Sequence, residues 1–196
     1  MMGGTFNPPH NGHIHAAQQA VRELKLDKLL LIPDNVPPHK VMPKHSADST
    51  QRFEMAKLMA LDIPRAQASD IELMRGGRSY TVDTLRQLHA QYPKDTLILL
   101  VGTDMLLTLD EWREPEQLCR LAQFAVVARD DRDRTAIKQK AQQLKQQWNA
   151  QVTVIDCPAV TVSSTQVRED RALCEQMVPE RIFAYIQQQG LYFSHK

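Results

Sequence analysis

Two histidines near the start of the chain, His10 and His13, are the side chains best suited to chemistry. They follow the run Gly3-Gly4-Thr5-Phe6-Asn7-Pro8-Pro9, and Gly12 lies between them. Imidazoles can donate hydrogen bonds to phosphoryl oxygens, and each can be neutral or charged near pH 7. The two leading glycines permit a tight turn and a close approach to a ligand, and the prolines stiffen the exit. The stretch therefore predicts a loop that binds phosphate.

A helix is expected to begin at these histidines. From His13 onward, apolar residues recur at helical spacing, which places His13 in the first turn. The N–H groups of a first turn have no acceptor inside the helix, and this end of the helix is positive, so anions bind there. Metal binding by His10, His13 and His15 is the alternative. No Cys, Asp or Glu lies nearby to complete such a site, so we expect no metal here and an ordinary structural role for His15.

A second predicted helix start lies near the other end of the chain. Ser163, Ser164 and Thr165 precede a helical segment, and Arg168 lies one turn in. A serine N-cap explains the hydroxyl groups by itself. A guanidinium at the same helix end can also form bidentate hydrogen bonds with phosphate oxygens. Two helix starts that both attract phosphate could hold a triphosphate between them.

The string from Gly3 to His13 resembles the signature of the HxGH nucleotidyltransferases, which transfer a nucleotidyl group from a nucleoside triphosphate to a phosphate. More narrowly, it resembles that of bacterial nicotinate-nucleotide adenylyltransferases. The run Ser163-Ser164-Thr165-Gln166-Val167-Arg168 matches the SSTxxR pattern of the family, and the resemblance spans nearly the whole chain. It implies a Rossmann-like α/β fold, a doubly wound and mainly parallel sheet with helices on both faces. It also implies that His10, His13 and Arg168 are catalytic.

The resemblance further implies an acceptor site. Pro37-Pro38-His39-Lys40 matches a segment that lies over the nucleotide phosphate, which assigns phosphate neutralisation to Lys40. Ser79-Tyr80-Thr81-Val82-Asp83-Thr84-Leu85 resembles the segment whose backbone holds the pyridine carboxylate. The pattern GxDxxxxLxxW, which ends at Trp112, offers an aromatic face for a pyridinium ring. Structural alternatives remain: a rigid turn for the prolines, an N-cap role for Ser79 or Thr81, and a core role for the tryptophan.

The predicted contacts fall into two groups. Those expected to bind ATP are Gly3, Gly4, Thr5, Phe6, His10, Gly12, His13, Gly102, Asp104, Ser163, Ser164, Thr165 and Arg168. Those expected to bind the acceptor are Asn35, His39, Lys40, Tyr80, Thr81 and Trp112. Asp104 follows a predicted buried strand, where it can accept from ribose hydroxyls or cap the next helix. Arg113 stands where relatives often have an aromatic residue. Mg²⁺ is expected to arrive with ATP rather than to be tightly bound by the protein.

The bulk properties limit the function classes. A chain of 196 residues indicates one domain, residues 1–196, with a C-terminal helical segment of about 163–192 that completes the ATP site. A net charge of +1 argues against a large basic face for nucleic acid. Three separated cysteines, Cys119, Cys157 and Cys174, favour a reducing cytoplasm. No run is long enough for a membrane helix. A homo-oligomer is possible.

Apolar runs predict the other elements. Strands are expected at residues 27–33, 67–73, 96–101, 124–128 and 152–155, and helices at 48–61, 79–92, 133–148 and within 178–192. A charged turn is expected at 129–134, and a helix is expected to start at Met105. Only Met1 and Met2 precede Gly3, so the strand that should lead into the glycine loop is expected to be missing or very short. We expect the natural reading frame to begin upstream.

The function implied by the resemblance is adenylyl transfer from ATP to nicotinate mononucleotide, which gives deamido-NAD and pyrophosphate. The mononucleotide phosphate would attack the α-phosphorus directly. Three alternatives remain. One is another HxGH transferase, with nicotinamide mononucleotide, phosphopantetheine or a cytidylyl acceptor as substrate. The second is a fragment of a class I aminoacyl-tRNA synthetase. The third is a non-catalytic regulator that binds nucleotide.

Overall fold

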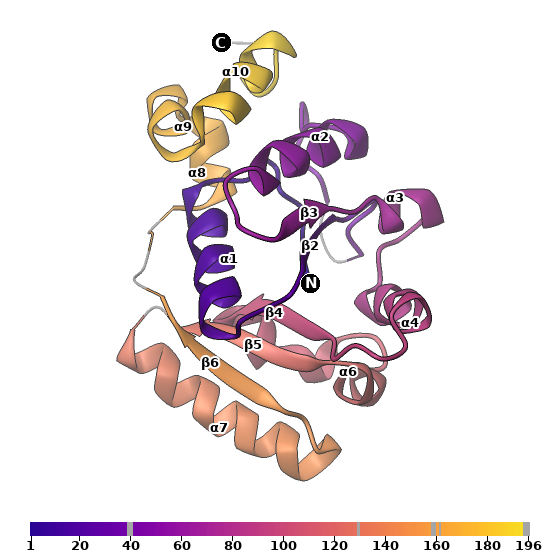
Figure 1. Ribbon diagram of the computed structural model, residues 1–196. Helices are drawn as coiled ribbons and strands as arrows, with labels where there is room; N and C mark the ends of the chain where they lie inside the picture. The colour runs from indigo at the N-terminus through magenta and orange to yellow at the C-terminus, as the bar shows by residue number, and fades with distance from the viewer. Residues whose placement is uncertain (39–40, 129, 158–159, 161, 194–196) are drawn as a thin grey trace.

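A parallel sheet of six strands forms the centre of the structure. The computed structural model describes residues 1–38, 41–128, 130–157, 160 and 162–193. The strand order is β3-β2-β1-β4-β5-β6 (Figure 1), and every pairing is parallel. The strands are β1 (Met2–Gly4), β2 (Leu29–Pro33), β3 (Ala66–Ala68), β4 (Ile98–Gly102), β5 (Gln123–Ala128) and β6 (Val152–Asp156). The order reverses beside β1, which makes this the topological switch point where open α/β sheets bind ligands.

Helices cover both faces of the sheet, as the doubly wound prediction requires. They are α1 (Asn11–Glu23), α2 (Ser49–Ala60), α3 (Ile71–Arg75), α4 (Thr81–Gln91), α5 (Thr103–Leu107), the 3₁₀ turn η1 (Leu109–Glu111), α6 (Pro115–Leu121), α7 (Asp131–Trp148), α8 (Ser164–Glu169), α9 (Arg171–Met177) and α10 (Glu180–Gln188). Side chains of a strand alternate between the faces. Leu100 therefore joins the core under α1, α2 and α10, whereas Leu99 and Val101 join the core under α4 to α7.

The strand that leads into the glycine loop is present and very short. Its three residues, Met2–Gly4, lie in the middle of the sheet, and Met2 pairs with both Leu31 of β2 and Leu100 of β4. The backbone of Met1 adds to this pairing, because Leu100 N–H donates to its carbonyl oxygen at 2.9 Å. Neighbours on both sides explain how so few residues hold a strand conformation.

Four predictions about the elements were wrong in part. The strand expected at 67–73 ends at Ala68, and Ile71–Arg75 is helical, because β3 is an edge strand that pairs only with β2. The turn expected at 129–134 overlaps α7, which begins at Asp131 after the Asp130 carboxylate accepts Asp133 N–H. The helix expected at Met105 begins at Thr103. Neither Ser79 nor Thr81 caps α4, since Tyr80 holds the N-cap position.

Two further observations concern the helices. Helix α9 falls within the helical segment expected at about 163–192, and with α8 and α10 it lies beside α2 at one end of the molecule (Figure 1). Within the described ranges, no helix has the length and apolar character needed to cross a membrane.

Candidate active site

The glycine-rich loop leaves the carboxyl end of the central strand β1 and enters α1. Phe6 within it is buried and has a positive φ of 47°. A Cβ atom on Gly4 would lie 3.3 Å from the Phe6 ring, so a larger residue would press on that ring. The Asn7-Pro8 peptide that follows is cis. The loop is thus packed against the sheet at the switch point.

The two histidines contact each other at the start of α1. His10 occupies the N-cap position, and its backbone N–H donates to Nδ1 of His13 at 3.2 Å. Their ring centroids are 3.8 Å apart, and the Phe6 ring lies edge-on to His13. Because Nδ1 of His13 accepts a hydrogen bond, the proton of its neutral ring is on Nε2. No acceptor among the described residues takes this proton, so His13 has one N–H donor to offer a ligand.

Burial makes both imidazoles neutral at pH 7. It lowers the pKa of His10 to about 4. It also lowers the pKa of His13 well below the ordinary value, and the neighbouring His10 adds to this effect. The sequence left the charge of these groups open, and the structure favours two neutral hydrogen-bonding rings.

Gly12 permits this arrangement of the rings. A Cβ atom at Gly12 would lie 3.0 Å from Nδ1 of His10, tighter than most such contacts, so the His10 ring would have to shift by a few tenths of an ångström. His10 is only 7% exposed, and within the described part of the chain its Nδ1 has no hydrogen-bond partner. Buried polar atoms normally have partners. An unpaired ring nitrogen at a helix start is consistent with a site that a ligand completes.

Helix α8 lies against the same loop. Ser164 Oγ donates to the carbonyl oxygen of Pro8 at 2.9 Å, and Nη1 of Arg168 donates to that of Asn7 at 2.5 Å. Nη2 of Arg168 donates to Thr165 Oγ1 at 3.1 Å. Ser163 is the N-cap residue, in a capping box with Gln166. The starts of α1 and α8, both predicted to bind phosphate, are therefore held together through the loop. Arg168 hydrogen-bonds to the loop backbone between them.

A buried arginine that the sequence analysis missed supports the loop from below. Arg52 on α2 is 2% exposed. Its Nη1 donates to the carbonyl oxygen of Thr5 at 3.0 Å and to Asp34 Oδ1 at 2.7 Å, and its Nη2 donates to the carbonyl oxygen of Asn35 at 2.9 Å. Asp34 also accepts from the Thr5 hydroxyl at 2.8 Å. One guanidinium thus joins the glycine-rich loop to the segment that follows β2.

Hydrogen bonds also connect the predicted acceptor segments. Asn35 N–H donates to Ser79 Oγ at 2.8 Å, and its side-chain amide donates to the carbonyl oxygen of Gly77 at 3.1 Å. Ser79 N–H donates to the carbonyl oxygen of Val36 at 2.9 Å. The loop after β2 and the entrance to α4 therefore form one unit. His39 and Lys40 lie outside the described residues, so their roles stay predictions.

The aromatic residues of the acceptor site share one hydrophobic cluster. Tyr80 and Trp112, both half-buried, pack against the core under α4 to α7. The Arg113 guanidinium carbon lies 4.5 Å from the Tyr80 ring centroid, a cation–π contact. Thr81 begins α4, directly after Tyr80. Arg113, which stands where an aromatic residue was expected, thus covers an aromatic ring of the predicted pyridine site.

The predicted ATP contacts at the carboxyl end of β4 are exposed to solvent. Gly102 is exposed at the N-cap of α5, and a Cβ atom there would meet nothing within 4 Å. Asp104 is exposed in the first turn of α5. Packing therefore does not require glycine at position 102. Contacts of Gly102 and Asp104 with ATP stay predictions.

Comparison with known proteins agrees with this geometry. A cytidylyltransferase-like family model matches residues 1–170. The chain therefore belongs to the cytidylyltransferase-like family. Relatives named probable nicotinate-nucleotide adenylyltransferase occur in Listeria monocytogenes, at 34% identity over 98% of this chain and 95% of the relative, and in Exiguobacterium sibiricum, at 36% identity over 98% and 97%. The nicotinic acid mononucleotide adenylyltransferase of Plasmodium falciparum, solved with NaAD, has the same fold, with a TM-score of 0.75, 16% identity and coverage of 97% and 95%.

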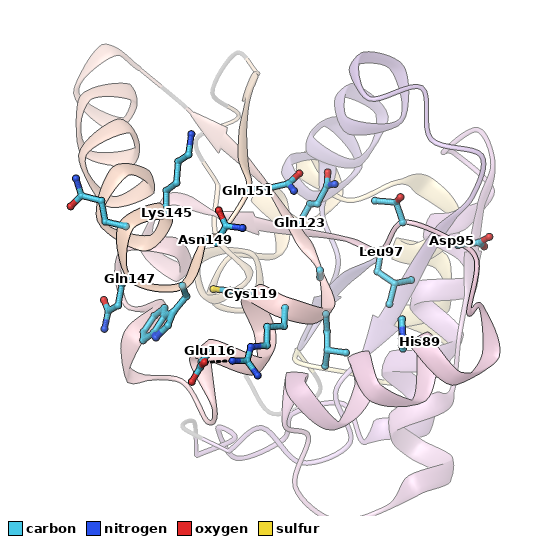
Figure 2. A pocket seen from close by; sticks show the side chains of 16 residues that line it. His89, Asp95, Leu97, Glu116, Cys119, Gln123, Lys145, Gln147, Asn149 and Gln151 are labelled. Atoms are coloured by element: carbon cyan, nitrogen blue, oxygen red, sulfur yellow. Dashed lines mark hydrogen bonds and ion pairs between the residues drawn. The ribbon is translucent and has the colours of Figure 1, made fainter.

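A hollow of about 730 Å³ lies away from this site (Figure 2). Leu97, Gln123 and Gln151 line it where β4, β5 and β6 begin, together with Cys119 and Asn149. It is at the amino ends of the strands, whereas the histidines are at the carboxyl ends. The part of the chain that the structure describes contains no cluster of three His, Cys, Asp or Glu residues that could hold a metal.

Acidification should destabilise the protein through His10. Its pKa is about 4 in the folded state and about 6.5 when unfolded, so the unfolded state binds more protons between these values and stability falls as the pH drops through this range. From pH 7 to pH 5 we expect His10 to account for a loss of about 2 kcal/mol in urea unfolding. Over the same pH change, the His10→Gln variant should lose correspondingly less free energy of unfolding. The exposed His89→Gln variant should lose as much as the wild type. Equal losses in all three proteins would contradict the assignment.

Removal of the Arg52 guanidinium should destabilise the protein strongly. Arg52→Met leaves the Asp34 carboxylate without its cation, so the free energy of unfolding should fall by about 3 to 5 kcal/mol. Arg120→Met is the matched control, since it breaks an exposed ion pair with Glu116 and should cost less than about 1 kcal/mol. Denaturant titration measures both values. A loss at Arg52 as small as that at Arg120 would show that it does not anchor the loop.

Proposed function

We propose that this protein transfers the adenylyl group of ATP to nicotinate mononucleotide, giving deamido-NAD and pyrophosphate, as a step of NAD biosynthesis. The observation that carries the proposal is the junction of the two helix starts through the carbonyl groups of Asn7 and Pro8. It supplies one continuous anion site for a triphosphate. The names of relatives that align over nearly their whole length support the choice of acceptor and of nucleotide.

The residues fit a direct displacement. An oxygen of the mononucleotide phosphate attacks the α-phosphorus of ATP, a new P–O bond forms, and the bond to pyrophosphate breaks with its electron pair on the leaving group. Nε2–H of His13 is a preorganised donor for the charge that develops on the phosphoryl oxygens, and His10 lies beside it. Positioning and charge stabilisation are enough for such a step, so no covalent nucleophile is required.

Further proposals concern the state in which the enzyme works. We propose that ATP enters as its Mg²⁺ complex, with the cation held mainly by phosphate oxygens. Three free cysteines, Cys119, Cys157 and Cys174, support a reducing cytoplasm as its location. The net charge of +1 supports small-molecule rather than nucleic-acid partners. Assembly into a homo-oligomer remains a prediction from the sequence.

Pyrophosphate release from Mg²⁺-ATP tests the proposal. Nicotinate mononucleotide, nicotinamide mononucleotide and phosphopantetheine are offered in parallel, and kcat/KM should be at least about tenfold higher for nicotinate mononucleotide. A preference for phosphopantetheine would favour another HxGH transferase. ATP binding without pyrophosphate release in the presence of any of the three acceptors would favour the regulator.

His13 offers the sharpest test of the catalytic arrangement. His13→Ala removes the Nε2–H donor, so kcat should fall by about 100-fold or more while the far-UV circular dichroism spectrum stays unchanged. His15→Ala is a matched control on the same helix, because His15 contacts Gln19 rather than the loop, and it should retain most activity. Turnover that survives in His13→Ala would overturn the role given to this residue.

A further inference from the structure

A buried carboxylate lies beneath the acceptor side of the site, and none of the steps above uses it. Glu72, on α3, is 6% exposed. A carboxylate in such a place is costly unless hydrogen bonds and a nearby cation compensate for its lost hydration. An apolar residue of similar size would fill the same volume without this cost. The contacts of Glu72 indicate what the carboxylate provides instead.

Polar groups from α3 and from the start of α4 surround Glu72. The hydroxyl of Thr84, which is fully buried, donates to Oε1 of Glu72 at 2.5 Å, and the hydroxyl of Ser79 also hydrogen-bonds to this carboxylate. Nη2 of Arg75 lies 3.9 Å from Oε1. Burial raises the pKa of Glu72, whereas these three groups act in the opposite direction and the nearby Asp34 adds to the rise.

The carboxylate fixes the direction of the surrounding hydrogen bonds. A serine or threonine hydroxyl has one proton, and a carboxylate can only accept. The Ser79 oxygen accepts Asn35 N–H at 2.8 Å, so its own proton can be offered to Glu72, whose pKa Ser79 helps to lower. Thr84 likewise gives its proton to Glu72 and accepts from Nη1 of Arg75 at 3.0 Å. The two hydroxyls bracket the first turn of α4, where Tyr80 and Thr81 lie.

We propose that Glu72 is a positioning residue for the pyridine nucleotide. Through Ser79 and Thr84 it holds the first turn of α4 in register with the loop that carries Asn35. It acts on the acceptor half of the site and not on the ATP half, which Arg168 and the histidines define. The inference rests on the proposed function, because it assigns the start of α4 to the acceptor.

The isosteric variant Glu72→Gln tests this role. An amide keeps only one acceptor oxygen and adds a donor, so Ser79 or Thr84 loses its acceptor and the bond to Asn35 is disturbed. The KM for nicotinate mononucleotide should rise about tenfold or more, while the KM for ATP stays within about twofold and kcat within about threefold. Glu54→Gln, on the exposed face of α2 beside Lys57, is the control and should change neither constant.

A double variant separates positioning from stability. Glu72→Met with Thr84→Val removes both ends of the hydrogen bond, which is close to neutral for stability when the shapes are kept. We expect a Tm near that of the wild type and a KM for nicotinate mononucleotide that stays raised. A normal acceptor KM in a folded double variant, or an equal rise in both KM values in Glu72→Gln, would overturn the positioning role alone. A wild-type enzyme without activity toward nicotinate mononucleotide would overturn the proposed function as well.

Discussion

The site depends on the buried side chain of Asn7. It is 1% exposed, so its amide group must find partners inside the protein. Its Oδ1 accepts from Ala47 N–H and from the hydroxyl of Tyr192, and its Nδ2 donates to Ser46. Its backbone carbonyl accepts from Arg168. The two ends of the chain thus meet on one residue, and these contacts tie the glycine-rich loop to the C-terminal helices.

Among the described residues, the groups gathered at the glycine-rich loop are hydrogen-bond donors and anchored guanidinium groups. Two helix starts supply unpaired N–H groups, and two neutral imidazoles supply further hydrogen-bonding capacity. The guanidinium groups of Arg168 and Arg52 are engaged with the loop backbone, so they fix geometry as well as supplying charge. Donors held rigidly in a buried site stabilise a developing negative charge without reorganisation, which suits the transfer of a phosphoryl-linked group.

Local signals in the sequence were enough to predict the parallel sheet and the glycine-rich loop that enters the first helix. Continuous apolar runs marked β2, β4 and β5, and glycine with histidine at a helix start marked the loop. Arg52 was missed because its side chain reads as solvent-facing by type. Its spacing gave a usable signal, since it shares the buried face of α2 with Met55, Ala56 and Met59. Glu72 could not be found, because its partners depend on how α3 turns into α4.

A crystal structure with a non-hydrolysable ATP analogue and nicotinate mononucleotide would test the central claim most directly. The account predicts the α-phosphate beside His10 and His13, the outer phosphates at the start of α8 near Ser164 and Arg168, and the pyridine ring at the first turn of α4. A triphosphate bound at another place, such as the hollow beside Cys119 at the amino ends of the strands, would contradict it.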